Sequence, residues 1–224
     1  MASVLLPTTT TGAAGLVALA AAGLCACWVG HKIHGTRQYW QECKADTLST
    51  QGVRCSSWTK RAEWFRVNDV IMGGKSTSQL QTDHEGRLLF EGVINTDGGG
   101  FASMRTGERC IVEVPQDAKA VRVVVEGDGQ MWKVNLGLSH SLMDSRPTWT
   151  HDFLTTKGTK QTHVLPLAAF SAQTRGRKVT GASLKLDEVQ YMGLILSLVD
   201  QDGKPNSHFG DGPFRLVLHE LEFE

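Results

Sequence analysis

The sequence predicts an all-β fold, a sandwich or barrel of packed strands that begins near residue 58. Three observations predict it. Apolar and polar residues alternate along several short stretches, glycine-rich turns separate these stretches, and neither a long helical period nor a β-α-β rhythm appears after residue 57. Hydrophobic residues make up 41% of the 224 residues, which is enough for a substantial core. The remaining span of about 165 residues suits one domain of this class.

The first element is hydrophobic. Residues 1–30 carry no charged side chain, and residues 12–29 are all apolar or small. Eighteen helical residues span roughly 27 Å, close to the hydrocarbon thickness of a bilayer. We therefore predict that residues 1–30 are a membrane anchor or targeting segment, with one transmembrane helix at 12–29. A cleaved targeting peptide of unusual composition and an ordinary buried helix are the alternatives.

The charges that follow this segment predict its orientation. Lys32, Arg37 and Lys44 come after it, so the positive-inside rule places the domain in the cytosol, the matrix or the stroma. Residues 31–57 mix charged and small polar side chains without a clear period, and we expect them to form a tether to a domain at 58–224. The five cysteines include no C-x-x-C pair, which favours unpaired thiols in a reducing compartment. A Cys43–Cys55 bridge is the alternative.

Two stretches in the middle of the chain show the clearest strand pattern. Val121, Val123 and Val125 share one face of the first, and the second alternates from Trp132 to Leu138. Between them lies Gly127-Asp128-Gly129-Gln130. Because an Asp-Gly pair between alternating stretches is typical of a tight turn, we predict that the two strands form a hairpin.

Other short stretches complete the set of strands. We predict them at Arg87–Ile94, Phe101–Arg105, Thr148–Leu154, Gln161–Leu165, Val189–Leu198 and Phe214–Phe223. In the last one, the apolar residues change parity between Leu218 and Leu221, which predicts a β-bulge near His219. A helical turn near Leu167–Ser171 is the expected exception to the β pattern.

Charge and motifs exclude several functions. The 23 basic and 23 acidic side chains balance, so nothing favours a nucleic acid partner. Gly74-Lys75-Ser76 lacks the preceding glycine of a phosphate-binding loop, the place being held by Asp69. The histidines form no H-E-x-x-H motif, and no G-x-S-x-G is present. We predict no catalytic residue, no metal and no cofactor.

Paired carboxylates are the one catalytic device that a sequence cannot exclude, because they meet only in the fold. Asp69, Asp97 and Asp128 are the candidates. All three sit beside glycine or asparagine, where aspartate has a structural role in turns.

The glycine-rich cluster Asp97-Gly98-Gly99-Gly100 has two interpretations. It forms tight turns at one rim of the sandwich, or it lets the backbone of a partner approach closely.

A series of motifs then appears in a fixed order along residues 58–224. The series is Trp64-x-x-x-Asn68-Asp69-x-x-Met72-Gly73-Gly74-x-Ser76, Phe90-x-Gly92, Gly99-Gly100-Phe101-Ala102-Ser103-x-Arg105, Gly127-Asp128-Gly129 with Trp132 and Lys133, Leu165-Pro166-Leu167-x-x-Phe170, Arg175-Gly176-Arg177, Met192-Gly193-Leu194 and Gly212-Pro213-Phe214-Arg215-Leu216. Together it resembles the complex I intermediate-associated protein 30 (CIA30) family. Lys75 departs from the small or apolar residue that the family more often has there.

The resemblance implies a galactose-binding-like jelly-roll β-sandwich. It also implies an assembly factor or chaperone, not an enzyme, that binds intermediates of mitochondrial respiratory complex I. With the predicted anchor, this places the protein in the mitochondrial inner membrane with its domain facing the matrix. Another membrane, with the domain on the cytosolic or stromal side, is the alternative.

We predict that partner-binding residues lie in the first and third motifs. They are Asn68, Asp69, Met72, Gly73, Gly74, Lys75, Ser76, Gly99, Gly100, Phe101, Ser103 and Arg105. Five others are predicted to form structural turns, namely Gly127, Asp128, Gly129, Gly212 and Pro213. The competing hypothesis is a carbohydrate- or small-ligand-binding module, or a hydrolase built on one. In that case Trp132, Trp149 and Tyr191 stack on sugar rings, unless they fill the core.

Overall fold

The computed structural model describes residues 48–50, 62–108, 110, 112–141 and 144–224. The predicted anchor at 12–29 and the cysteine pair Cys43 and Cys55 lie outside these residues. Among the residues that are described, no helix is long and apolar enough to cross a membrane.

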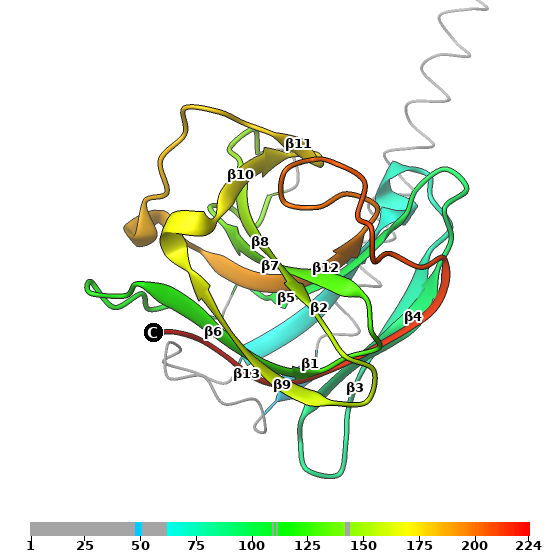
Figure 1. The fold of residues 1–224 in the computed structure, drawn as a ribbon. Helices are drawn as coiled ribbons and strands as arrows, with labels where there is room; N and C mark the ends of the chain where they lie inside the picture. The colour runs from blue at the N-terminus through cyan, green and yellow to red at the C-terminus, as the bar shows by residue number, and fades with distance from the viewer. Residues whose placement is uncertain (1–47, 51–61, 109, 111, 142–143) are drawn as a thin grey trace, which may run out of the picture. The chain divides into compact units, whose positions relative to one another are not determined.

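Two antiparallel sheets make up the described domain (Figure 1). The eight-stranded sheet has the order β1-β2-β5-β12-β7-β8-β10-β11. Its strands are β1 (Leu48–Thr50), β2 (Ala62–Asn68), β5 (Phe101–Thr106), β12 (Tyr191–Ser197), β7 (Met131–Gly137), β8 (Thr148–Leu154), β10 (Ser171–Thr174) and β11 (Arg177–Lys178). β1, which lies within the segment expected to be a tether, pairs with β2.

The second sheet has five strands in the order β3-β4-β13-β6-β9. Its members are β3 (Thr77–Thr82), β4 (Leu88–Ile94), β13 (Gly212–Phe223), β6 (Ala120–Glu126) and β9 (Lys160–Pro166). Three short 3-10 helices are η1 (Asp69–Met72), η2 (Leu167–Ala169) and η3 (Leu186–Glu188). The prediction of an all-β sandwich is confirmed, and η2 lies where a helical turn was expected.

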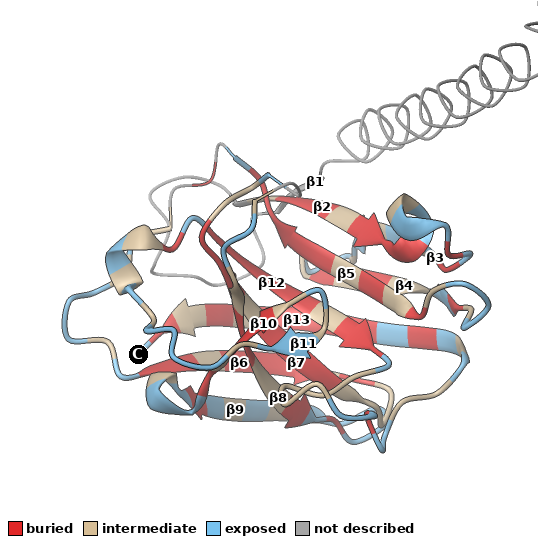
Figure 2. Cartoon of the chain, turned by 90° about the horizontal axis from the view of Figure 1, so that it is seen from above, coloured by how far each residue is buried: buried red, intermediate tan, exposed pale blue. Residues whose placement is uncertain are grey.

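The core lies between the two sheets because the alternating side chains of both meet there. From the eight-stranded sheet come Trp132, Val134 and Leu136, all fully buried, and Figure 2 shows buried segments along strands of both sheets. Phe90 and Phe214 come from the other sheet, and their ring centroids lie 6.0 and 5.8 Å from that of Trp132. This aromatic cluster joins the two layers at their centre.

The predicted hairpin at Gly127–Gln130 is wrong. β6 pairs with β13 and β9 in the five-stranded sheet, whereas β7 pairs with β12 and β8 in the other. The glycines serve a crossover between the sheets: Gly127 forms a parallel bridge with Lys157, and a Cβ on it would lie 2.4 Å from that of Thr155. Asp128 binds the backbone N–H of Gln130 and the indole N–H of Trp132, so the turn is stabilised without pairing the strands.

The predicted bulge is confirmed. The pairing of β13 with β6 shifts register between Leu218 and Glu220, so His219 is the extra residue. Phe214, Leu216 and Leu218 face the core before the bulge, and Leu221 and Phe223 face it afterwards.

Candidate functional site

The eight-stranded sheet carries a pocket on the face that is turned away from the five-stranded sheet. Its volume is about 620 Å³. On β5 the side chains of Phe101, Ser103 and Arg105 line it, whereas Ala102 is buried in the core between the sheets. The alternation of the central strands therefore builds the core on one side and the pocket on the other.

Strand register arranges the floor of the pocket. Gly193 on β12 is paired with Arg105 on β5 and with Asn135 on β7, and Asn135 is paired with Thr150 on β8. Arg105, Asn135 and Thr150 therefore lie in one row across four strands. Gly193 contributes no side chain to that row, and a Cβ there would lie 2.6 Å from the Met104 carbonyl oxygen and 2.9 Å from the Arg105 Cβ. Lys133 precedes Asn135 by two residues and lies on the same face.

Arg105 is held between two aromatic rings at one end of this row. Its guanidinium carbon lies 4.9 Å from the ring centroid of Phe65 and 4.8 Å from that of Tyr191. Its Nη2 donates a hydrogen bond of 3.0 Å to the carbonyl of His140. The side chain is only 6% exposed, and the ring faces and the carbonyl dipole both stabilise its charge.

Lys133 is the second buried cation of the site. It is 3% exposed, and its Nζ donates a 2.6 Å hydrogen bond to the carbonyl of Val199. Burial lowers the pKa of Lys133 to about 8, although the nearby carboxylates of Asp152 and Asp200 oppose that shift. The ammonium is therefore still charged near pH 7.

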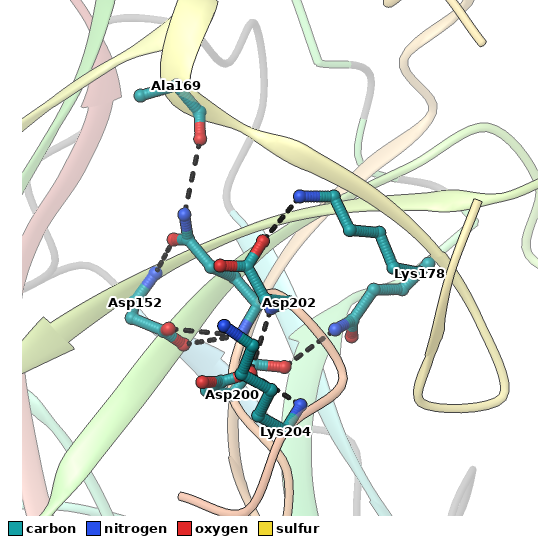
Figure 3. Close-up of polar contacts among 8 residues, drawn as sticks. Asp152, Ala169, Lys178, Asp200, Asp202 and Lys204 are labelled. Carbon is teal, nitrogen blue, oxygen red and sulfur yellow. Dashed lines mark hydrogen bonds and ion pairs between the residues drawn. The ribbon is translucent and has the colours of Figure 1, made fainter. Parts of the chain in front are cut away.

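A turn at residues 200–204 is fixed beside the pocket by reciprocal hydrogen bonds (Figure 3). The Asp152 carboxylate accepts from the backbone N–H of Gln201 at 2.9 Å, and Gln201 Oε1 accepts from the backbone N–H of Asp152 at 2.8 Å. Lys178 Nζ donates to Asp202 Oδ1 at 2.5 Å. Since Val199 directly precedes this turn, these contacts also fix the carbonyl that holds Lys133.

Asp69 joins the two glycine-rich segments that the sequence singled out. This fully buried carboxylate accepts hydrogen bonds from the backbone and hydroxyl of Ser76 at 3.0 and 2.6 Å. It also accepts from the backbone N–H groups of Gly100 and Phe101 at 2.6 and 3.2 Å. A Cβ on Gly74 or Gly99 would lie 2.3 Å from Asp69 atoms, so glycine is required at both positions.

The predicted partner-binding residues thus meet in space, but they divide into two groups. Asn68, Asp69 and Ser76 are buried; Asp69 and Ser76 bind the local backbone, and Asn68 accepts from the Ser78 hydroxyl. Phe101, Ser103 and Arg105 face the pocket, and Met72 is 62% exposed at its edge. Lys75 is exposed and forms an ion pair with Asp97. Gly73 has a φ of +94°, which ends η1.

Of the residues predicted to form structural turns, Gly127, Asp128 and Gly129 lie in the crossover between β6 and β7. Asp128 accepts from the backbone N–H of Arg215 at 3.0 Å, which ties the crossover to β13. Gly212, with a φ of +104°, and Pro213 are instead the first residues of that strand and pair with β4, so the turn predicted there is wrong.

The alternative hypotheses can also be placed. Trp132 and Trp149 belong to the core, whereas Tyr191 lines the pocket. Of the three candidate carboxylates, Asp69 lines the pocket, Asp128 lies at the crossover and Asp97 is exposed. Across the part of the chain that the structure describes, no group of three or more His, Cys, Asp or Glu side chains could hold a metal ion.

Sequence reasoning missed most of the pocket floor. Asn135, Thr150 and Gln173 were not singled out, and Lys133 appeared only within a motif. The sequence does carry a signal for these residues, because they are the polar residues on one face of strands whose other face is apolar. Without the register of five strands, that signal cannot be distinguished from an ordinary solvent-exposed face.

Comparison with known proteins gives one family and a group of similar folds. The family model described as "Complex I intermediate-associated protein 30 (CIA30)" matches residues 53–218. No curated protein matches the chain.

Two solved structures with similar folds are carbohydrate-binding modules of family 11 from Clostridium thermocellum. One is in complex with a beta-1,3-1,4-mixed-linked tetrasaccharide, and it has 10% identity and a TM-score of 0.45 over 78% of this chain and 92% of its own. The other belongs to a cellulosomal cellulase, with 10% identity and a TM-score of 0.47 over 78% of this chain and 91% of its own.

Proposed function

The chain belongs to the complex I intermediate-associated protein 30 family, and on this basis we propose that it is an assembly factor that binds intermediates of respiratory complex I. The observation that carries the proposal is the extent of the match, which runs from residue 53 to residue 218 and so includes most strands of both sheets. In this proposal the domain acts by binding, without catalysing a reaction.

The proposed contact surface is the apolar edge of the pocket, which we call the η1 rim and define as Val70, Ile71, Met72 and Leu198. Met72 is 62% exposed and Leu198 is 41% exposed, and both line the pocket. Leu198 packs against Gly100, where a Cβ would lie 2.3 Å from its Cδ1. Methionine and leucine on a rigid support are suited to protein recognition, because they bury apolar area without much reorganisation of the backbone.

In the same proposal, residues 12–29 tether the domain to the mitochondrial inner membrane on the matrix side. A tether confines the domain to the surface where membrane-arm intermediates lie. It raises the effective concentration for binding without adding a contact.

The experiment that tests the contact surface is affinity purification of the full-length chain from mitochondria. The double variant Met72→Asp, Leu198→Asp places two charges on the η1 rim, and it should lose complex I intermediates while keeping its melting temperature. The matched control is Val93→Asp, Val164→Asp, which changes two exposed apolar residues of the five-stranded sheet. The control should purify the same intermediates as the wild type.

Two results would contradict the proposal at different levels. A folded η1 rim variant that still purifies the intermediates would show that the contact lies elsewhere. A wild-type chain that purifies none of them would refute the assembly function itself. Carbonate extraction of the full-length chain, compared with a variant lacking residues 1–30, tests the tether separately.

A further inference from the structure

The pocket on the eight-stranded sheet gathers positive charge in a chain whose charges balance overall. Four cationic side chains line it, namely Arg105, Lys133, Arg175 and Arg177, against one carboxylate, Asp69. The oxygens of Asp69 already accept four hydrogen bonds from Ser76, Gly100 and Phe101. The pocket therefore presents a positive lining, whereas the whole chain has 23 basic and 23 acidic residues.

The two arginines at the β10–β11 turn are available to a ligand. Both are exposed, and none of the ion pairs between described residues involves either of them. Arg175 has a φ of +51°, and Gly176 follows it at +75°. Gly203 in the fixed 200–204 turn lies against this turn, since a Cβ on it would lie 3.1 Å from the Gly176 carbonyl oxygen. The 200–204 turn thus packs against the backbone that carries these two guanidinium groups.

The floor supplies hydrogen-bonding groups that the described residues leave unused. The Thr150 hydroxyl is buried, at 1% exposure for the residue, and it has no hydrogen-bond partner among the described residues. Asn135 lies opposite it in the strand pairing. The Lys133 ammonium has three N–H groups, of which the structure assigns one, to the carbonyl of Val199. A buried hydroxyl without a partner is unfavourable for folding, which is expected where a ligand completes the site.

We propose that this pocket binds a small organic phosphate of about the size of a sugar phosphate. A volume of about 620 Å³ lies within the range of small-molecule sites. Guanidinium groups match phosphate oxygens in paired hydrogen bonds, and Arg105 is already oriented by the rings of Phe65 and Tyr191. The hydroxyl groups of the ligand would bind Asn135 and Thr150. This proposal stands independently of the assembly function.

Isothermal titration calorimetry on the purified full-length chain tests the proposal. The probes are glucose 6-phosphate, glucose, and glycerophosphoinositol, which is the water-soluble part of a lipid. Glucose 6-phosphate should bind saturably at one site per chain, and glucose at least about tenfold more weakly because it lacks the charge-assisted bonds. Tighter binding of glycerophosphoinositol than of glucose 6-phosphate would assign the site to a lipid headgroup, and the reverse order to a free phosphate monoester. Either order supports the phosphate site.

Variants identify the residues. Arg175→Gln, Arg177→Gln should weaken phosphate binding about tenfold or more, while Lys119→Gln, Lys160→Gln removes the same charge from exposed positions outside the pocket and should change nothing. Thr150→Val should weaken binding several-fold and, because it removes the buried hydroxyl, raise the melting temperature of the ligand-free chain.

Three results would overturn the proposal. They are the absence of saturable binding for both phosphates, equal affinities for glucose and glucose 6-phosphate, and unchanged phosphate affinity in the arginine variant.

Discussion

Asp69 is the residue on which the geometry of both glycine-rich segments depends. Replacing it with Asn keeps the volume but turns one acceptor into an N–H donor that faces other donors, from Ser76 or from Gly100 and Phe101. We expect Asp69→Asn to lower the free energy of unfolding by roughly 2–4 kcal/mol. Urea denaturation measures this change in the free energy of unfolding. The exposed Asp97→Asn is the control, and an equal loss in the two variants would contradict the structural role of Asp69.

Lys133 gives a pH dependence whose sign follows from its burial. Its pKa falls from 10.5 to about 8 in the folded state, so between these values the unfolded chain binds more protons. Below pH 8 the cost of burying the charged ammonium destabilises the folded state in full. This cost disappears as the pH rises toward 10.5. The stability of the wild type relative to Lys133→Met should therefore increase over this range, by on the order of 2–3 kcal/mol.

The comparison with a variant is needed because another group titrates in the opposite direction. Burial raises the pKa of the Cys110 thiol from 9.0 to about 11, so its contribution falls as the pH rises above 9. Both proteins retain Cys110, and its effect cancels in the difference. Parallel stability curves for the two proteins would show that Lys133 is not buried in solution.

Among the elements, β13 permits an unusual test, because its bulge separates two regular halves. Leu218 pairs with Val125 and Glu220 with Val124, so the residue between them has no partner on β6. Deleting His219 should leave a folded domain, since the alternation of core residues then continues without a break. Deleting Val217 should destabilise the domain far more, because a regular strand would then turn Leu218 outward and place His219 in the core. Circular dichroism with thermal unfolding compares the two, and equal damage from both deletions would contradict this view of the bulge.

The elements also show what a sequence can reveal. Strands with strict alternation, such as Thr148–Leu154, were predicted nearly to their ends. The alternation of apolar and polar residues shows directly which face of a strand is buried. β3 was missed since it is an edge strand of polar residues, TSQLQT. The hairpin at Gly127–Gln130 was mispredicted because the same turn residues serve a crossover, and only the partners of Asp128 and Thr155 distinguish the two cases.

At the scale of the whole domain, the two sheets should unfold together, because one aromatic cluster joins them. Phe214 from the five-stranded sheet lies 5.8 Å from Trp132 of the other, measured between ring centroids. We expect Phe214→Ala to cost about 3–5 kcal/mol. Hydrogen exchange should show the same loss of protection in β12 as in β4. The exposed Val164→Ala is the control, and a loss confined to one sheet would contradict a single cooperative unit.

The pocket also depends on the fold of the whole domain, which explains why the sequence revealed only part of it. Two glycine-rich segments were predicted to form one surface, and Asp69 does bring them together. The pocket floor instead depends on pairings between β5, β12, β7 and β8, and the most distant partners, Phe101 and Ser197, are 96 residues apart. Such pairings leave no local trace in composition or period.

The central place of β13 has a consequence for how the protein is made. β13 is the last described strand along the chain, yet it lies between β4 and β6 in the middle of its sheet. During translation, β4 and β6 therefore emerge with a hydrogen-bonding edge and an apolar face that nothing yet covers. The five-stranded sheet can close only after residues 212–223 have left the ribosome, so the nascent domain must be protected from aggregation until then.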